Sequence, residues 1–271
     1  MKITIVTPSY NQGEYLEQTI LSVLNQGYDT LEYIVIDGGS TDNSVEIIRK
    51  YADRLAYWVS EKDKGQTEAI NKGFKKATGD VVGWVNSDDI LMPGCLQKIN
   101  DVFTNKNPDV IFGWTIRIDK DNKILFNHFL PKQSLWLGRR GVYFFGQPSW
   151  FWKREMFDYL GYLDETCHAC MDVEYIMRQI MAMPKIVHVP EILSGYRWHE
   201  MTKTAQNGSI WTDDMIRLGK KYKILSYNNP KTYAKAIYGL IKVFNGNYLR
   251  QYLFTKKWGG KPLMEYINNK K

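Results

Sequence analysis

The N-terminal part of the chain alternates short β-rich segments with helical patterns, and this alternation limits the possible folds more than any other feature. It predicts helices at about 14–26, 43–51, 66–77 and 93–103, and strands at Ile3–Thr7 (stopped by Pro8), Glu32–Asp37, Leu55–Ser60 and Asp80–Asn86. Such alternation is typical of βαβ units that build a mainly parallel sheet flanked by helices. Right-handed crossovers bring the carboxyl ends of these strands to one edge, where open α/β sheets bind ligands.

The rest of the chain is less regular. Helices are expected near 154–160 and 171–183, and strands at Val110–Ile118, Ile124–Phe129, Gln147–Lys153 and Lys185–Val189, the first two joined as an antiparallel pair by a turn over 119–122. From Ile210 onward the pattern is helical, basic and aromatic. These changes predict one α/β domain over residues 1–209 and a helical C-terminal region over residues 210–271.

Composition and charge exclude several classes of protein. The 271 residues are 44% hydrophobic and 24% charged, which argues against a disordered, collagenous or coiled-coil protein. Residues 1–210 hold 23 Lys and Arg against 26 Asp and Glu, whereas residues 211–271 hold 13 against 3, so the net charge of +7 comes from the C-terminal region. A nucleic-acid-binding domain carries positive charge across the face that follows the phosphates, so we expect no nucleic-acid partner.

Three further features bear on where the protein works. Three cysteines cannot form a disulfide framework. The N-terminus reaches Pro8 and polar residues before an apolar signal segment could form. No window offers the ~18 uncharged apolar residues of a membrane span. These features predict a cytoplasmic protein, with peripheral attachment to the inner face of the cell membrane as the alternative.

Polar and acidic residues collect where the first four predicted strands end. The clusters are 7–11, Asp37, 61–66 and 86–89. Carboxylates that converge at one edge repel one another unless a cation offsets them. Hard oxygen ligands with no Cys or His nearby suit Mg²⁺ or Mn²⁺ rather than zinc. Neither a P-loop nor a G-x-G-x-x-G motif follows the first strand, so a nicotinamide-dependent enzyme is not expected.

Four segments of the chain form an ordered set of motifs. They are Thr-Pro-Ser-Tyr-Asn after the first strand, Ile-Asp-Gly-Gly-Ser-Thr-Asp-Asn-Ser after the second, Ser-Glu-Lys-Asp-Lys-Gly-Gln with Ala-Ile-Asn-Lys-Gly, and Asn-Ser-Asp-Asp after the fourth. Together they resemble the motifs of family 2 glycosyltransferases. The resemblance covers residues 3 to about 200. It implies the GT-A fold, an inverting transfer of a sugar from a nucleotide-sugar donor, and a divalent metal as cofactor, Mn²⁺ or Mg²⁺.

The resemblance also implies roles for residues on the donor side. Ser87-Asp88-Asp89 matches the D-x-D-type element, with Asp88 facing the ribose and Asp89 the metal, and His199 matches a C-terminal His near the metal or diphosphate. Arg197 could oppose a phosphate charge or form a surface ion pair. The residues expected to bind the nucleotide sugar are Thr7, Pro8, Tyr10, Asn11, Asp37, Asp63, Gln66, Asn71 and Asp88.

On the acceptor side, the segment around Met171-Asp172-Val173-Glu174 resembles the part of the family that holds the general base. Asp172 is the candidate base, and the alternative is that it caps the helix that follows. Glu174 is expected to line the acceptor side, or else to pair with Arg178 at i, i+4. Gln147 and Pro148 match the lining of the acceptor pocket. Cys167 and Cys170 lack the four ligands of a structural zinc site and are expected to be a coincidence.

The basic C-terminal region allows two interpretations. Its mixture of Lys, Arg and aromatic residues predicts contact with an anionic membrane through residues 211–271, or simply a solvated helical face. For the whole protein we expect a glycosyltransferase that uses a UDP-sugar, with thymidine or guanosine diphosphate sugars as alternatives. Its acceptor would be a saccharide or lipid-linked saccharide of bacterial-type cell-surface polysaccharide assembly. The rival functions are a sugar nucleotidyltransferase, which should show a Gly- and Arg/Lys-rich loop after the first strand, and a non-catalytic carbohydrate-binding or membrane scaffold.

Overall fold

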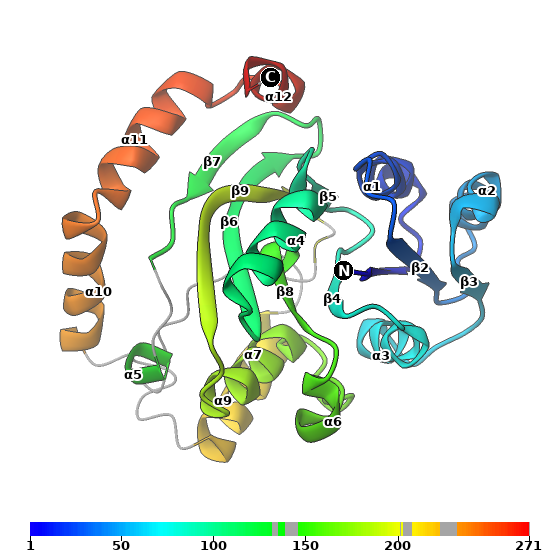
Figure 1. Cartoon of the computed structure of the whole chain (residues 1–271), viewed down its shortest axis with the longest axis horizontal. Helices are drawn as coiled ribbons and strands as arrows, with labels where there is room; N and C mark the ends of the chain where they lie inside the picture. Colours follow the sequence, from blue (N-terminus) through cyan, green and yellow to red (C-terminus); the bar gives the residue numbers. More distant parts are fainter. Residues whose placement is uncertain (132–134, 139–145, 201, 203–207, 223–231, 271) are drawn as a thin grey trace.

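A computed structural model describes residues 1–131, 135–138, 146–200, 202, 208–222 and 232–270 (Figure 1). The strands are β1 (Ile3–Ser9), β2 (Leu31–Asp37), β3 (Tyr57–Ser60), β4 (Val81–Trp84), β5 (Ile90–Leu91), β6 (Val110–Asp119), β7 (Ile124–His128), β8 (Trp150–Lys153) and β9 (Ile186–Trp198). The helices are α1 (Gly13–Leu24), α2 (Ser44–Lys50), α3 (Gln66–Lys76), α4 (Cys95–Lys106), α5 (Leu135–Gly138), α6 (Met156–Leu160), α7 (Met171–Met181), α9 (Gly208–Lys221), α10 (Thr232–Phe244), α11 (Asn247–Trp258) and α12 (Leu263–Lys270), with 3-10 turns at Ala52–Arg54 and Gln147–Ser149.

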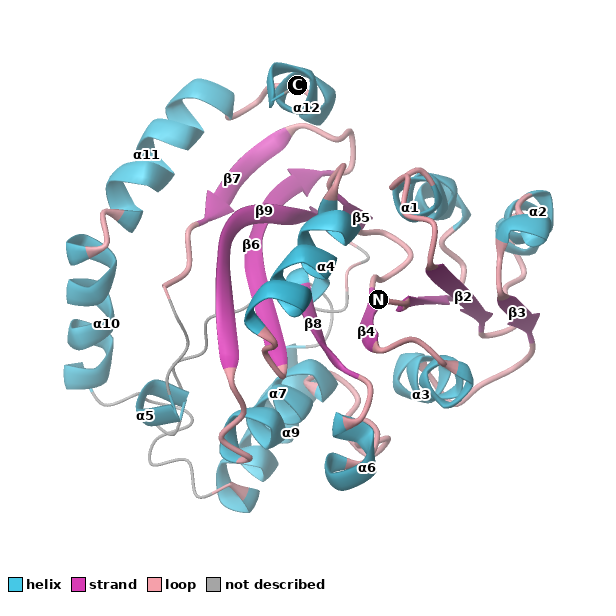
Figure 2. Ribbon diagram, in the orientation of Figure 1, coloured by secondary structure: helices cyan, strands magenta, loops and turns pink. Residues whose placement is uncertain are grey.

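Within the described residues, nine strands form one sheet in the order β3-β2-β1-β4-β8-β6-β9-β5, and β7 pairs with the outer part of β6 (Figure 2). β1 to β4 are parallel, as the sequence predicts. β8 is antiparallel to both β4 and β6, and β6 is parallel to β9. The predicted α/β fold is confirmed, but the parallel part of the sheet ends at β4 and the second half is mixed.

The sequence predicts that β1 stops at Pro8, but the strand continues to Ser9. Its pairing with β4 ends at Val6, whereas its pairing with β2 runs on through Pro8 to Ser9. Proline has no N–H to donate, so it is tolerated where one side of a strand no longer needs a partner. The consequence is that β1 carries its polar end one step further toward the cleft described below.

β9 is much longer than the predicted strand, which ends before Pro190. Two extra residues bulge out of β9 between its pairs with Phe112 and Trp114 of β6, and Pro190 lies in that bulge. Bulges bend a strand and absorb residues that cannot join the ladder. After the bend β9 pairs with β6 again as far as Trp198. This second part, which the sequence analysis misses, carries His199 toward the cleft.

Three hydrophobic clusters hold the layers together. α3, α7 and α9 cover one face of the sheet, and α1, α2 and α4 cover the other. Val6 of β1 points into the first cluster and Ile5 into the second, which explains why this central strand is apolar at almost every position. At Gly73 of α3 an added Cβ would lie 2.4 Å from Val6, so only glycine allows this close contact between helix and sheet.

Parts of the C-terminal region pack into the body of the protein. Met215 and Leu218 of α9 are buried in the first cluster. Trp258, Leu263 and Tyr266 are buried in a third cluster beside β6 and β7. The helix α9, which follows the predicted domain boundary at residue 209, contributes to the same core as α3 and α7. The boundary itself stays a prediction. Among the described helices, none has both the length and the apolar character needed to cross a membrane.

Candidate active site

A cleft of about 1440 Å³ lies where β1, β2, β3 and β4 end. The N-terminal turns of α1, α3 and α7, the 3-10 turn at Gln147–Ser149, the β6–β7 turn and the end of β9 also contribute to its lining. Nine of the predicted site residues line it: Pro8, Tyr10, Asn11, Asp63, Gln66, Asp88, Gln147, Asp172 and His199. Six predicted site residues do not: Thr7, Asp37, Asn71, Asp89, Pro148 and Glu174.

Two loops shape the end of the cleft nearest β1 and β2. Asn11 has a φ of 50°, and its side-chain oxygen accepts a hydrogen bond from the Thr41 N–H at 2.8 Å. The Asn11 N–H donates in turn to Ser40 Oγ at 2.8 Å, so the two strand ends are tied to each other. This arrangement leaves Tyr10 60% exposed next to Pro8. An exposed aromatic ring at a strand end is a surface on which a flat nucleobase can stack.

Asp37 supports the same end of the cleft from behind. It is fully buried, and its Oδ2 accepts hydrogen bonds from the N–H groups of Gly39 (3.1 Å) and Ser40 (2.9 Å) and from Ser60 Oγ (2.7 Å). Gly39 has a φ of 81°, a left-handed conformation that favours glycine. Asp37 therefore fixes the loop, and the backbone of Gly38 and Gly39 forms the cleft wall.

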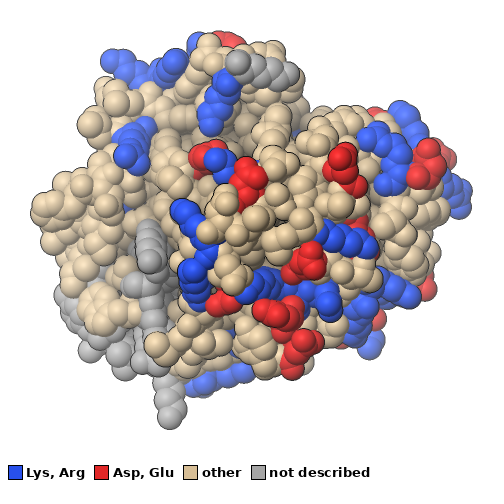
Figure 3. All heavy atoms as spheres, viewed as in Figure 1, with Lys and Arg blue, Asp and Glu red and all other residues tan. Residues whose placement is uncertain are grey.

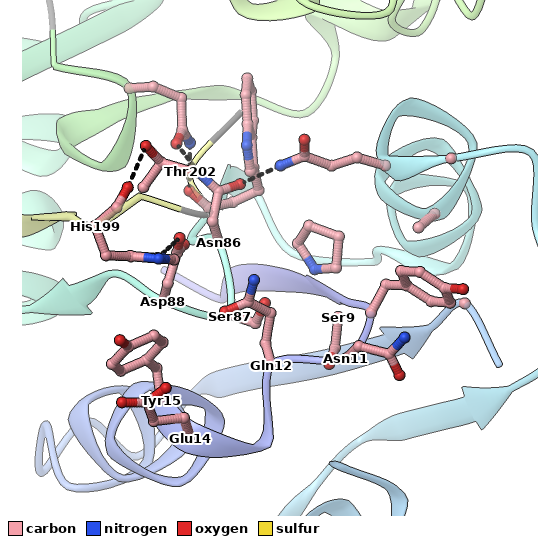
Figure 4. Close-up of a pocket in the computed structure, with 18 of the residues that line it drawn as sticks. Ser9, Asn11, Gln12, Glu14, Tyr15, Asn86, Ser87, Asp88, His199 and Thr202 are labelled. Carbon is pink, nitrogen blue, oxygen red and sulfur yellow. Dashed lines mark hydrogen bonds and ion pairs between the residues drawn. The ribbon is translucent and has the colours of Figure 1, made fainter. Parts of the chain in front are cut away.

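Asp88 and His199 meet at the centre of the cleft. Asp88 Oδ2 lies 3.1 Å from His199 Nε2, and the two side chains are 17% and 7% exposed. The Tyr15 ring of α1 lies beside the imidazole, with 4.9 Å between ring centroids. Figure 4 shows Asp88 and His199 pointing toward one another. The bend of β9 thus brings an imidazole to the carboxylate that follows β4, although 111 residues separate them in sequence.

Asp89 lies behind Asp88 and is fully buried. Its Oδ1 accepts the Arg197 N–H at 2.9 Å, and its Oδ2 accepts Asn86 Nδ2 at 3.1 Å. Burial, and then the charge of Asp88, raise the pKa of Asp89 well above its ordinary range. The geometry does not favour the expected division of roles, with Asp88 on the ribose and Asp89 on the metal. Asn86, Ser87 and Asp88 line the cleft, whereas Asp89 is buried behind them.

Arg197 is buried and does not line the cleft, which corrects the suggestion that it opposes a phosphate or lies in a surface ion pair. Its Nε donates to the Asp88 carbonyl oxygen at 2.8 Å. One terminal nitrogen donates to Asn122 Oδ1 at 2.8 Å and the other to Gln18 Oε1 at 3.1 Å. Arg197 therefore ties the turn after β4 to the β6–β7 turn and to α1, and so holds Asp88 in place.

A row of amide side chains crosses the floor of the cleft. Gln66 Nε2 donates to Asn86 Oδ1 at 2.7 Å, and Asn86 Nδ2 donates to Gln147 Oε1 at 3.0 Å. Gln147 Nε2 donates to the Trp84 carbonyl oxygen at 2.8 Å, which fixes the far end of the row. Pro148 is buried behind Gln147 rather than exposed on the acceptor side. The floor is therefore neutral, polar and rigidly hydrogen-bonded.

Asp172 faces the cleft from the first turn of α7. Cys170 occupies the N-cap position of the helix but makes no side-chain capping hydrogen bond, and Asp172 is the second residue of the helix. Its Oδ1 accepts the neighbouring Val173 N–H at 2.8 Å. The positive end of a helix dipole stabilises a negative charge at this position. The structure thus places an anionic group in the cleft on the side of the amide row, and its role as general base stays a prediction.

Glu174 lies two residues further along α7 but is fully buried on the opposite side. Its Oε2 accepts Arg178 at 2.6 Å, and its Oε1 accepts Lys221 at 3.0 Å and the Tyr222 hydroxyl at 2.5 Å. The expected acceptor-side role is not supported by this position. The alternative pairing with Arg178 is present, and the same carboxylate also joins α7 to the end of α9.

Two residues predicted to bind the donor, Thr7 and Asn71, are buried and make structural hydrogen bonds instead of lining the cleft. Thr7 is buried, and its Oγ1 lies 3.0 Å from the Tyr33 hydroxyl of β2. Asn71 is buried in α3 and binds both backbone groups of Leu163, with Nδ2 donating at 2.9 Å and Oδ1 accepting at 3.0 Å. Thr7 lies outside the cleft because successive side chains of a strand point to opposite faces of the sheet. Asn71 lies outside it because it is on the side of α3 that contacts Leu163. Asn71 positions the segment that leads to α7.

Some cleft residues escape the sequence analysis. They are Tyr15 of α1, Trp84 of β4, Trp198 at the end of β9, and the β6–β7 turn at 119–121. The turn is predicted only as a connection, and nothing in its sequence signals that it reaches the site. Cys167 and Cys170 are buried free thiols, and burial raises the pKa of both. Among the described residues, no group of three or more His, Cys, Asp or Glu side chains is arranged to hold a metal by itself.

Comparison with known proteins decides the family. The model of Glycosyl transferase family 2 matches residues 4–173. The chain belongs to glycosyltransferase family 2. This match covers β1 to β8, the turn after β4 and the start of α7. It supports the resemblance drawn from the sequence, and it argues against the nucleotidyltransferase alternative.

Relatives in sequence carry only the general description of this family. The chain is 38% identical over 106 residues to an uncharacterized glycosyltransferase of Nostoc sp., a match that covers 38% of this chain and 33% of that protein. It is 27% identical over 244 residues to an uncharacterized glycosyltransferase of Methanocaldococcus jannaschii, covering 86% of this chain and 79% of that one. The matches to the first curated relatives span only about a third to two fifths of those relatives' length.

Solved structures confirm the GT-A fold of this family 2 member. S. aureus TarS 1-349 in complex with UDP-GlcNAc aligns with a TM-score of 0.67 at 17% identity, over 89% of this chain and 71% of that one. Mannosyltransferase PcManGT from Pyrobaculum calidifontis in complex with GDP-Man and Mn²⁺ aligns with a TM-score of 0.62 at 18% identity, over 90% and 75%. At such identities the likeness establishes the fold alone.

Proposed function

We propose that this protein is a metal-dependent inverting glycosyltransferase that moves a sugar from a nucleotide-diphosphate donor to an acceptor hydroxyl. The observation that carries the proposal is the position of Asp88 and Asp172. Both face one cleft from different elements, with a neutral amide floor near them. One carboxylate is paired with His199 and the other stands at a helix N-terminus. Two carboxylates in unlike environments suit two different roles.

Asp88 and His199 fit the requirements of a divalent cation. A carboxylate oxygen and an imidazole nitrogen lie 3.1 Å apart on the cleft surface. Mg²⁺ is usually held by one or two carboxylates, with substrate phosphates and water supplying the remaining ligands. Mn²⁺ accepts the same oxygen donors together with imidazole. A metal held here would neutralise charge on the leaving diphosphate. In this proposal Asp88 replaces Asp89 as the metal ligand, and Asp89 holds the turn.

Asp172 is the general base in this proposal. It removes the proton of the acceptor hydroxyl while that oxygen forms a bond to the anomeric carbon of the donor sugar. The bond between this carbon and the diphosphate oxygen breaks, and its electron pair leaves with the nucleotide diphosphate. The approach is in line with the leaving group, so the anomeric configuration inverts. The fixed amide row and the rigid strand ends supply the orientation that such a displacement requires.

The donor in this proposal is a UDP-sugar, bound with its base near Pro8 and Tyr10 and in reach of Asp63. TarS was solved with UDP-GlcNAc, which supports a uracil nucleotide, whereas PcManGT was solved with GDP-Man, which keeps a guanosine nucleotide as the alternative. The acceptor is a saccharide or a lipid-linked saccharide, in the assembly of a bacterial-type cell-surface polysaccharide. A panel of nucleotide sugars incubated with Mn²⁺, read by donor hydrolysis, identifies the donor.

Titration calorimetry with UDP tests the metal. We expect Mn²⁺ to strengthen UDP binding to the wild-type protein, because a cation removes the repulsion between Asp88 and the diphosphate. Asp88→Asn should lose this effect of Mn²⁺. Asp121→Asn is the matched control, since it removes an exposed carboxylate from the lining of the same cleft. UDP binding by the wild-type protein that does not change with Mn²⁺ would contradict the metal assignment.

A further inference from the structure

The outer side of α10 and α11 forms an apolar surface, which we call the α10–α11 face. Its residues are Leu240, Val243, Phe244, Leu249, Tyr252 and Leu253, each more than half exposed, with Phe244 at 86%. Scattered apolar side chains on a surface are common, but a group of this size on two consecutive helices is not. Such a patch marks a place where the protein meets a partner.

The exposure of this face follows from how the two helices are packed. Tyr238 and Ile241 of α10 and Phe254 of α11 pack against the third hydrophobic cluster, and Trp258 at the end of α11 is buried in it. The Phe254 ring lies 5.8 Å from the Phe129 ring of the body of the protein. One apolar side of α10 and α11 is therefore packed against the core of the protein. The α10–α11 face is a second apolar side, which that packing leaves in contact with water.

The charge around this face has one sign. Residues 215–264 contain 11 Lys and Arg and no Asp or Glu. Arg250, Lys256 and Lys257 are exposed on α11 itself. Figure 3 shows the surface over α10 and α11 as mostly tan, with blue side chains toward its upper end and no red. A partner that fits must be apolar inside and negatively charged at its surface.

We propose that the α10–α11 face docks on an anionic phospholipid membrane. Leucine, phenylalanine and tyrosine side chains would enter the boundary between headgroups and acyl chains, and the basic residues would contact lipid phosphates. A second copy of this chain is a poorer occupant. A symmetric pair brings the same patch of both subunits together, and that would set basic side chains against basic side chains.

The position of the face in the fold gives the docking a purpose, if the proposed sugar transfer is correct. α10 and α11 lie along one end of the molecule, beside β7, whereas β1 to β3 with their nucleotide-binding loops lie at the other end (Figure 1). A protein attached through α10 and α11 keeps the donor end directed toward water. The membrane is then nearest to the half of the protein that contains β6, β7 and β9. This arrangement suits a water-soluble donor and an acceptor carried on a lipid.

Co-sedimentation with vesicles tests the docking. The full-length protein should bind vesicles made of equal parts of phosphatidylglycerol and phosphatidylcholine, and should bind pure phosphatidylcholine vesicles much less. Raising the salt concentration should weaken binding, because it screens the attraction to lipid phosphates. The triple variant Arg250→Gln, Lys256→Gln, Lys257→Gln should lose about fivefold in affinity for each charge removed. The quadruple variant Phe244→Gln, Leu249→Gln, Tyr252→Gln, Leu253→Gln should lose at least about tenfold.

Matched substitutions on other elements serve as controls. Lys75→Gln with Lys76→Gln removes exposed charge from α3, and Tyr159→Gln with Met183→Gln removes exposed apolar side chains near α6 and α7. These variants should bind vesicles like the wild-type protein. All the changed side chains are exposed, so circular dichroism should show unchanged folding.

Two results would overturn the proposal. One is equal sedimentation of the wild-type protein and the quadruple variant. The other is a stable dimer in analytical ultracentrifugation that the quadruple variant abolishes, because it would show that a second copy covers the face. Vesicle binding is measured without any substrate, so its failure leaves the proposed sugar transfer intact. Failure of sugar transfer likewise leaves the docking result unaffected.

Discussion

In the first half of the molecule, from β1 to β4, the strands carry their polar ends directly to the cleft. In the second half, from β6 onward, the cleft residues come from a helix N-terminus, a hairpin turn and the end of a bent strand. The loops of the first half are tied to their neighbours in the sheet, as Asn11 is to Ser40. The second half reaches the first through contacts that are distant in sequence: His199 meets Asp88 across 111 residues, and Arg197 reaches from β9 to Gln18 across 179.

The comparison shows two ways of building one site. A parallel sheet with short crossovers places strand ends side by side by its topology, so the contacts that fix the donor end, such as those of Asn11 and Asp37, join neighbouring strand ends. The other half has no such rule and depends on buried polar residues, such as Arg197 and Glu174, to fix its parts. We therefore expect substitutions in the first half to change donor binding, and substitutions in the second half to change either chemistry or stability.

The largest effect is expected at Asp172. Asp172→Asn should lower kcat by about 10²–10⁴, because a sugar hydroxyl is a poor nucleophile until a positioned base removes its proton. Donor affinity should change little because Asp172 does not lie at the nucleotide end, and the melting temperature should change little because an asparagine oxygen can accept the same Val173 N–H. Steady-state kinetics and UDP calorimetry measure the two quantities. Asp158→Asn, an exposed acidic residue in the first turn of α6, is the control.

A fully active Asp172→Asn enzyme would remove this residue from the chemistry. A product that keeps the anomeric configuration of the donor, determined by NMR, would contradict the inverting mechanism itself. Either result would mean that the second half of the cleft does not contribute in the way that we propose.

Glu174, on the same helix, should behave in the opposite way. Glu174→Gln leaves Arg178 and Lys221 without their shared buried carboxylate, and breaking a buried ion pair typically costs about 3–5 kcal/mol. Urea denaturation should show this loss in the free energy of unfolding, while kcat of the folded enzyme stays close to that of the wild type. A fall in kcat as large as that of Asp172→Asn, without any loss in the free energy of unfolding, would instead place Glu174 in the active site.

The smallest effect is expected in the first half, at Glu32. Burial acts to raise its pKa, but hydrogen bonds from Lys2, Thr4 and Thr78 outweigh burial and lower the pKa to about 2. A lowered folded-state pKa means that Glu32 stabilises the fold above about pH 5, and that up to about 3 kcal/mol is lost as the pH falls toward 2. Denaturation across this range should show the loss, and Glu32→Gln should remove that part of the pH dependence. A variant with the same pH profile as the wild type would assign the acid sensitivity to other carboxylates.

The sequence predicts the first half of the molecule better than the second, because the first half is built from local βαβ units and the second from long-range contacts. The strands and helices up to residue 106 lie close to their predicted positions, because each βαβ unit buries a short apolar run that is visible in the sequence. The sequence misses β5, and it ends the ninth strand at Val189 instead of Trp198. A two-residue strand has no periodicity to detect. The continuation beyond Pro190 depends on a bulge that only pairing with β6 makes possible.

The amino-acid sequence by itself determined the family, the α/β class and which strand ends carry polar groups, because these follow from local patterns and from the order of motifs along the chain. Only the tertiary structure decided which side chain of each motif faces the cleft. Asp88 faces it and Asp89 does not, and Asp172 faces it while Glu174 is buried. Neighbouring residues of the same type differ only in the direction in which the backbone points them. That direction is set by long-range contacts such as those of Arg197 and Lys221, which leave no local pattern in the sequence.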